Sequence, residues 1–171
     1  MNSNPVLPRI PNLIIIGGSS RNVGKTTLAL KLIEKYAGSE TITGLKVTSI
    51  RRGEESHHGS HHNPDLQNFR ITEETSDKSS KDTSKMLTAG ADRVYYIETP
   101  DNKMNKAVDM FLATKNTGGP IVCESRNLRI AVIPGLFVLL KHYDASQIKS
   151  GFEFYEKLAD ITLTIDPIIK N

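Results

Sequence analysis

The sequence predicts an α/β protein with a doubly wound, mostly parallel sheet, and three observations predict it. Continuous apolar runs recur at residues 13–17, 121–124 and 136–140. Segments with helical periodicity separate the apolar runs along the chain. A polar, glycine-containing loop joins the first run to the first helix. Because continuous apolar strands are typical of sheets covered on both faces, this alternation predicts three layers, α/β/α.

The length of 171 residues corresponds to one domain with a substantial core. Residues 1–12 contain Pro5, Pro8 and Pro11. Each proline removes a backbone donor, so we expect an extended lead-in at residues 1–12 and a single domain at residues 13–171.

Residues 13–33 contain the motif around which the other elements are arranged. The apolar strand leads into a loop that ends in Gly24-Lys25-Thr26, and a helix begins at Gly24. This order is that of a phosphate-binding P-loop, in which backbone N–H groups and the helix N-terminus form an anion nest. We expect Lys25 to contact the β- and γ-phosphates in catalysis and the Thr26 hydroxyl to bind Mg²⁺. The motif assigns these residues to nucleotide binding: Ser19, Ser20, Arg21, Asn22, Val23, Gly24, Lys25, Thr26 and Thr27.

The loop departs from the pattern G-x-x-x-x-G-K-[ST] at one position. Ser19 stands where the pattern has glycine, and the glycines are Gly17 and Gly18 instead. The flanking strand and helix fit a P-loop, which predicts a P-loop NTPase domain with Mg²⁺ and either GTP or ATP as its ligands.

The next two segments differ sharply in composition. Residues 41–50 are rich in β-branched side chains and predict a second strand. Residues 51–81 are polar and nearly free of apolar side chains, and we expect a mobile loop that becomes ordered over the bound nucleotide. Four of the five histidines lie in this loop, in pairs at i, i+4: His57, His58, His61 and His62. A metal or substrate site and a solvated loop both stay open, and the absence of a well-placed carboxylate or cysteine favours the solvated loop.

Helices and strands alternate through the rest of the chain. We expect a helix at 81–89, capped by Asp82 or Thr83 and ended by Gly90. A strand at 92–98 and an amphipathic helix at 101–115, capped by Asp101, follow. The remaining expected elements are a strand at 121–124, a short helix at 125–133, a strand at 136–140, a helix at 151–159 and an edge or penultimate strand at 160–166.

Glu124 ends the apolar strand at 121–124. A carboxylate at the carboxyl end of a parallel strand near a P-loop commonly holds Mg²⁺ or orients its water. We therefore expect Glu124 to act in catalysis and in metal binding. Asp82 is an alternative metal ligand, or a helix cap and nothing more.

The composition of the chain excludes several classes of protein. The formal net charge of +3 is too small to indicate nucleic-acid binding, and no apolar run is long enough to span a bilayer. The lone Cys123 excludes an intrachain disulfide. Residues 1–12 lack a basic region followed by an apolar one, so we expect no signal peptide. A cytoplasmic protein is expected, and whether it forms a homodimer stays open.

Three stretches resemble the MobB family, the GTP-binding proteins of molybdopterin-guanine dinucleotide biosynthesis. They are the P-loop at residues 17–27, the segment from Lys81-Asp82-Thr83-Ser84 to Ala89-Gly90-Ala91, and the strand that ends in Glu124. The resemblance implies Mg²⁺-dependent GTP binding, slow hydrolysis and a partner protein from molybdenum-cofactor biosynthesis.

Two departures from that family leave alternatives open. Ser125-Arg126 follow Glu124 where the family has glycine, and Arg51-Arg52-Gly53 stand where it has a histidine. The loop is also similar to that of dethiobiotin synthetase, an ATP-dependent enzyme that phosphorylates a small acid. A metallochaperone GTPase that uses residues 57–62 is the third alternative. No Asn-Lys-x-Asp motif selects guanine, so the choice between GTP, which the resemblance favours, and ATP stays open.

Overall fold

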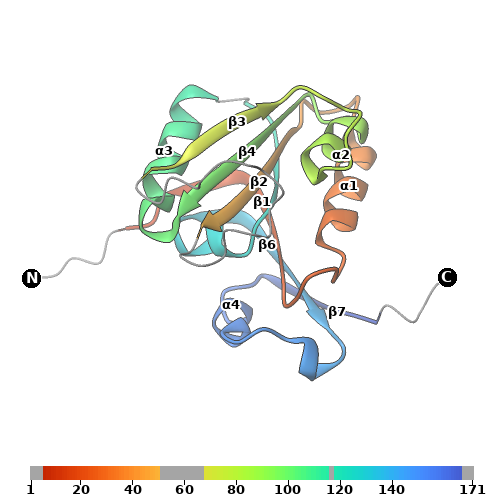
Figure 1. The fold of residues 1–171 in the computed structure, drawn as a ribbon, viewed down its shortest axis with the longest axis vertical. Helices are drawn as coiled ribbons and strands as arrows, with labels where there is room; N and C mark the ends of the chain where they lie inside the picture. Colours follow the sequence, from red (N-terminus) through yellow and green to blue (C-terminus); the bar gives the residue numbers. More distant parts are fainter. Residues whose placement is uncertain (1–5, 51–67, 116–117, 167–171) are drawn as a thin grey trace, which may run out of the picture.

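The computed structural model describes residues 6–50, 68–115 and 118–166, which form a mostly parallel sheet with helices on both faces (Figure 1). The described strands are β1 (Arg9–Gly18), β2 (Thr43–Ile50), β3 (Arg70–Glu74), β4 (Arg93–Pro100), β5 (Ile121–Glu124), β6 (Ile133–His142) and β7 (Ile161–Ile165). Their order in the sheet is β3-β4-β2-β5-β1-β6-β7, and only the β3–β4 pair is antiparallel. The predicted fold class is confirmed.

Two hydrophobic clusters cover the two faces of the sheet. On one face, α1 (Lys25–Tyr36) and α2 (Asp82–Thr88) pack through buried side chains such as Ile33 and Met86. On the other, α3 (Met104–Thr114), α4 (Phe152–Glu156) and the 3₁₀ turn η2 (Asn127–Ile130) contribute Phe111, Phe152 and Leu128. Two further 3₁₀ turns are η1 (Asp101–Lys103) and η3 (Ala145–Gln147). Burial of apolar surface on both faces explains why the central strands read as continuous apolar runs.

The strand that leads into the P-loop lies deep in the sheet, between β5 and β6. Ile15 and Ile16 are fully buried, one on each face. Ile16 is paired with Glu124 in the parallel register, so the end of β5 lies beside the start of the P-loop.

Two strands are longer than predicted. β1 begins at Arg9, where it pairs with Ile133, instead of at residue 13. β6 also begins at Ile133 and runs through Pro134 and Gly135, which we expected to end a helix. A Cβ on Gly135 would lie 1.9 Å from the Pro11 carbonyl oxygen, so glycine lets the two strands approach.

Three other local predictions were wrong. Residues 70–74 lie in the predicted long loop but form β3, which pairs antiparallel with β4. Residues 125–133 contain the 3₁₀ turn η2 and no α-helix. The N-cap of η1 is Pro100 and not Asp101. The N-cap of α2 is Lys81, and neither Asp82 nor Thr83 has this role. The prediction that 160–166 forms an edge or penultimate strand is confirmed, since β7 is an edge.

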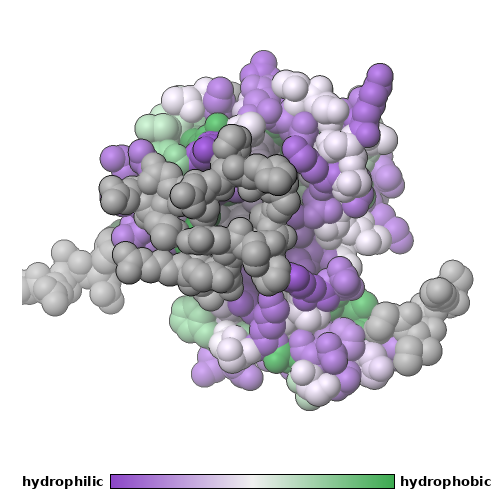
Figure 2. Space-filling model, in the orientation of Figure 1, coloured by the Kyte–Doolittle hydropathy of each residue, from purple (hydrophilic) through white to green (hydrophobic). Residues whose placement is uncertain are grey.

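The surface is hydrophilic over most of the face in Figure 2. The exposed hydrophobic side chains of the described residues include Phe154 of α4 and Ile161 and Leu163 of β7. No helix in the described ranges is both long and apolar enough to cross a bilayer. The histidines at positions 57–62, and the hypotheses about a metal site and an ordering loop there, lie outside the described residues.

Candidate nucleotide-binding site

The P-loop joins β1 to α1 with two residues in the left-handed backbone region. Asn22 has φ 58° and Gly24, the N-cap of α1, has φ 99°. Asparagine tolerates this conformation and glycine adopts it freely, which explains both residue types. Left-handed residues in such a loop turn successive N–H groups inward, and these form an anion-binding concavity at the helix N-terminus.

Neighbouring side chains leave no room for a side chain at Gly18, which explains why glycine stands there. A Cβ on Gly18 would lie 2.6 Å from Val23 Cγ1 and 2.9 Å from Lys25 Cδ. Ser19 is fully buried, and its Oγ accepts a hydrogen bond from the backbone N–H of His142 at 2.8 Å. Serine therefore stabilises the loop against the end of β6, which accounts for the departure from the usual motif.

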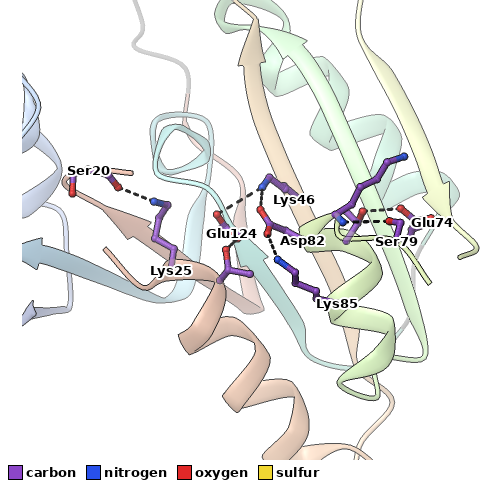
Figure 3. Close-up of polar contacts among 11 residues, drawn as sticks. Ser20, Lys25, Lys46, Glu74, Ser79, Asp82, Lys85 and Glu124 are labelled. Atoms are coloured by element: carbon purple, nitrogen blue, oxygen red, sulfur yellow. Dashed lines mark hydrogen bonds and ion pairs between the residues drawn. The ribbon is translucent and has the colours of Figure 1, made fainter. Parts of the chain in front are cut away.

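Lys25 extends back across the loop, where its Nζ donates to the Ser20 carbonyl oxygen at 2.9 Å (Figure 3). Burial lowers the pKa of Lys25 below its ordinary value. Glu124 opposes this shift, whereas Lys46, Lys149 and Arg126 add to it. The charged form is thus destabilised, and an anion beside the ammonium would stabilise it.

Thr26 and Glu124 meet at the first turn of α1. Thr26 Oγ1 donates to Glu124 Oε2 at 2.8 Å, and Glu124 is buried. A hydroxyl and a carboxylate are hard oxygen donors of the kind that Mg²⁺ takes from a protein, while phosphates and water supply its other ligands. The two side chains therefore fit a magnesium ion, with Thr26 and Glu124 as the groups that would hold it.

Lys46 is one of the residues at this site that sequence reasoning missed. It lies between two acids (Figure 3): its Nζ forms a short ion pair with Asp82 Oδ2 and lies 3.9 Å from Glu124 Oε1. Lys46 and Glu124 are direct partners in the β2–β5 register. The available signal was a lysine as the one charged side chain of β2, because a charge in a central strand needs a partner.

Asp82 lies in the first turn of α2 and is joined to the site through Lys46. Burial raises the pKa of its carboxyl, but hydrogen bonds and charge from Lys46 and Lys85 overcome this and lower the pKa. Lys85 Nζ lies 3.5 Å from Asp82 Oδ1. Asp82 is thus ionised and already neutralised by two lysines, whereas Glu124 has the Thr26 hydroxyl beside it.

An open cleft of about 280 Å³ lies in front of the P-loop, between the ends of β2 and β5 and the segment that contains Lys149. Among the described residues, its lining includes one carboxylate, that of Glu124, and five basic side chains: Arg21, Lys25, Lys46, Arg126 and Lys149. Such an excess of cations in a concave site attracts a polyanion. The sequence motif predicted only two of these five cations.

The other predicted loop residues have different surroundings. Val23 is buried in the core beneath α1, and Asn22 and Thr27 are exposed. Ser20 lines the cleft, and its Oγ is buried without a hydrogen-bond partner among the described residues. In the same part of the chain, no group of three or more His, Cys, Asp or Glu residues is arranged to hold a metal ion.

Comparisons with known proteins bear on the fold. No known protein family and no curated protein matches the sequence. Among solved structures, the chain is similar to LpxK from Aquifex aeolicus, in a crystal structure described as an "apo" form in complex with ATP. The TM-score is 0.56 and the identity 14% over 96% of this chain and 51% of LpxK. This chain therefore spans about half the length of LpxK, and the likeness shows a shared fold.

Proposed function

We propose that the protein binds a nucleoside triphosphate with Mg²⁺ at the P-loop and hydrolyses it slowly. The observation that carries this proposal is the convergence of Lys25, Thr26 and Glu124 at the N-terminus of α1. That LpxK, which has the same fold, was crystallised with ATP supports a nucleotide as the ligand.

Each of the three side chains has a separate role in the proposed activity. Lys25 exchanges its contact with the Ser20 carbonyl for the β- and γ-phosphates, which restore its stable charged form. Thr26 and Glu124 hold Mg²⁺, which supplies charge neutralisation at the phosphates when bound. Glu124 also orients a water molecule toward the terminal phosphorus.

The finer assignment rests on the sequence resemblance to the MobB family. It specifies GTP as the nucleotide and assistance to molybdopterin guanylylation, with a molybdenum-cofactor biosynthesis protein as partner. Calorimetric titration of GTP and ATP, each with Mg²⁺, tests the choice of base. Preference for GTP supports the MobB-like role, and preference for ATP contradicts it.

The magnesium assignment has its own test. Thr26→Ala and Glu124→Gln should weaken the Mg²⁺ dependence of hydrolysis more than they weaken nucleotide binding, since both groups act on the ion. Lys25→Ala should instead abolish tight triphosphate binding in a folded protein. If Glu124→Gln hydrolyses nucleotide at the wild-type rate, Glu124 is only a structural acid.

One observation favours a second candidate, phosphoryl transfer to a small anionic acceptor as in dethiobiotin synthetase. The cleft extends beyond the P-loop to Lys46, Ser49 and Asn127, which can hold a second anion. Release of phosphate without an added acceptor distinguishes hydrolysis from transfer. The described residues offer no support for the metallochaperone alternative, because its histidines lie outside them.

A further inference from the structure

Arg126 carries a buried polar group that nothing in the described structure satisfies. Its Nη1 is buried and has no hydrogen-bond partner among the described residues, and none of the ion pairs between those residues includes it. The residue lines the cleft, two positions after Glu124. Because an unpaired buried donor destabilises a fold, a guanidinium kept in this state indicates an acceptor that binds from the cleft.

The guanidinium is held in place by its surroundings. Its central carbon lies 4.7 Å from the centre of the Tyr155 ring. Tyr155 Oη donates to Asn127 Oδ1 at 3.1 Å, and Asn127 Nδ2 donates to Ser49 Oγ at 2.9 Å. Stacking on an aromatic face leaves the N–H edge of arginine free for a planar, bidentate contact with phosphate oxygens.

The backbone of Arg126 lies close to the point where β1 leads into the P-loop. Its Cα would be 3.3 Å from a Cβ on Gly17, so its backbone rests against the end of β1. Its charge acts on the ammonium of Lys25, the group assigned to the β- and γ-phosphates. Both side chains line the cleft, Lys25 from the end of the P-loop and Arg126 from just after β5.

We propose that Arg126 binds the terminal phosphoryl group and stabilises its transfer, as an arginine supplied by the chain itself. This inference rests on the proposed triphosphate hydrolysis. In that step the water oxygen forms a bond to the terminal phosphorus as the bond to the β–γ bridging oxygen breaks. The electron pair of the broken bond stays on the diphosphate, and the proton of the water leaves with the inorganic phosphate or to solvent. Arg126 keeps its protons and stabilises the charge on the transferred group.

Arg126 lies outside the P-loop at residues 17–27 and follows Glu124 and Ser125 after the end of β5. The arginine is therefore a feature of this chain that the P-loop motif does not contain. A built-in arginine contributes about 10³–10⁵-fold to hydrolysis in P-loop NTPases that have one.

The test compares Arg126→Ala, Arg126→Lys and the matched control Arg129→Ala. Arg129 lies in η2, the 3₁₀ turn whose N-cap is Arg126, and its guanidinium donates to the Val132 carbonyl oxygen. We expect Arg126→Ala to lower the rate of GTP or ATP hydrolysis at least about 100-fold while nucleoside-diphosphate affinity stays within about twofold. Arg126→Lys should restore only part of the rate, because lysine lacks the planar fork. Binding of the diphosphate with aluminium fluoride, a mimic of the transferred group, should be lost in Arg126→Ala.

Three results would overturn the inference: a wild-type hydrolysis rate in Arg126→Ala, an equal loss of diphosphate affinity, or an equal rate loss in Arg129→Ala. If Arg126→Ala unfolds, Arg126→Lys with the same thermal midpoint as the wild type provides the comparison. Wild-type protein that binds no triphosphate would contradict the proposed function itself, whereas hydrolysis without dependence on Arg126 contradicts only this inference.

Discussion

At the scale of the single residue, Lys25 is a cation whose surroundings oppose its charge. Burial and three neighbouring cations lower its pKa from the ordinary value of 10.5, against the attraction of Glu124. Between the folded and unfolded pKa values the unfolded chain binds more protons, so the cost to stability disappears as pH rises through that range. At neutral pH the nucleotide-free protein bears this cost, and a polyphosphate relieves it.

We therefore predict opposite effects of Lys25→Met on binding and on stability. Triphosphate affinity should fall at least about tenfold, since a charge-assisted contact is lost. The thermal midpoint of the nucleotide-free variant should equal or exceed that of the wild type. Lys31→Met, on the exposed face of the same helix, is the control and should change neither quantity. A clear loss of stability in Lys25→Met would show that the contact with Ser20 outweighs the cost of burial.

Ionisation of Asp82 stabilises the folded protein, whereas the charge on Lys25 destabilises it. The pKa of Asp82 lies below the ordinary value of 3.8, because Lys46 and Lys85 overcome the effect of burial. Its ionisation stabilises the fold above the unfolded pKa, and this contribution is lost as pH falls through the folded pKa.

Asp82→Asn should accordingly lower the free energy of unfolding by a constant amount above about pH 5, and by less below about pH 4. Denaturant unfolding as a function of pH measures the difference. Asp109→Asn on the exposed side of α3 serves as the comparison variant and should show no such dependence. A wild-type–variant difference that is independent of pH would argue against the ion pair with Lys46.

At the scale of the element, the P-loop combines a sterically required glycine with a serine that the motif does not contain. Gly18→Ala brings a methyl group against Val23 and Lys25, so Lys25 must move and nucleotide affinity should fall more than stability. Ser19→Ala removes only the acceptor for the His142 N–H, which should cost about 1 kcal/mol of unfolding free energy and leave affinity within a few-fold. Calorimetric binding and thermal unfolding of both variants measure this contrast. Equal losses of affinity would contradict it.

Elements were predictable where their signal is local. Residues 121–124 are apolar and end in an acid, and they form β5 with the predicted bounds. β3 was missed because only Ile71 of its five residues is apolar, and its pairing with β4 determines its structure. The start of β6 was missed because a Pro-Gly pair such as Pro134-Gly135 usually ends a helix or strand. Gly135 is required here by the close approach of β1, which is a tertiary contact that the local sequence does not reveal.

The residues of the site were likewise predictable only where their signal is local in the sequence. Lys25 and Thr26 follow from the spacing of a contiguous motif, and the position of Glu124 follows from the ends of parallel strands. Lys46, Arg126 and Lys149 come from three separate segments, and only the strand order brings them to one cleft. Their residue types are visible in the sequence, but the convergence is not.

At the scale of the whole molecule, the distribution of charge determines the attraction of an anionic ligand more than the net charge does. The chain carries a formal net charge of only +3, yet the described lining of the cleft has five basic side chains and one carboxylate. Placement of β5 between β1 and β2 brings these groups together at the carboxyl ends of the strands. A concentrated positive field of this kind attracts a polyphosphate over a distance set by ionic strength.

The affinity for a nucleoside triphosphate should therefore fall steeply with added salt, and the slope should depend on where the charges lie. We compare two double variants that remove the same total charge: Arg21→Gln with Lys149→Gln in the cleft, and Lys31→Gln with Lys35→Gln on the exposed side of α1. Titrations between about 0.05 and 0.5 M salt should give a shallower slope for the cleft pair and a wild-type slope for the α1 pair, since the Debye length falls below about 10 Å above 0.1 M. Equal slopes in the two double variants would mean that net charge, and not the cleft, attracts the nucleotide.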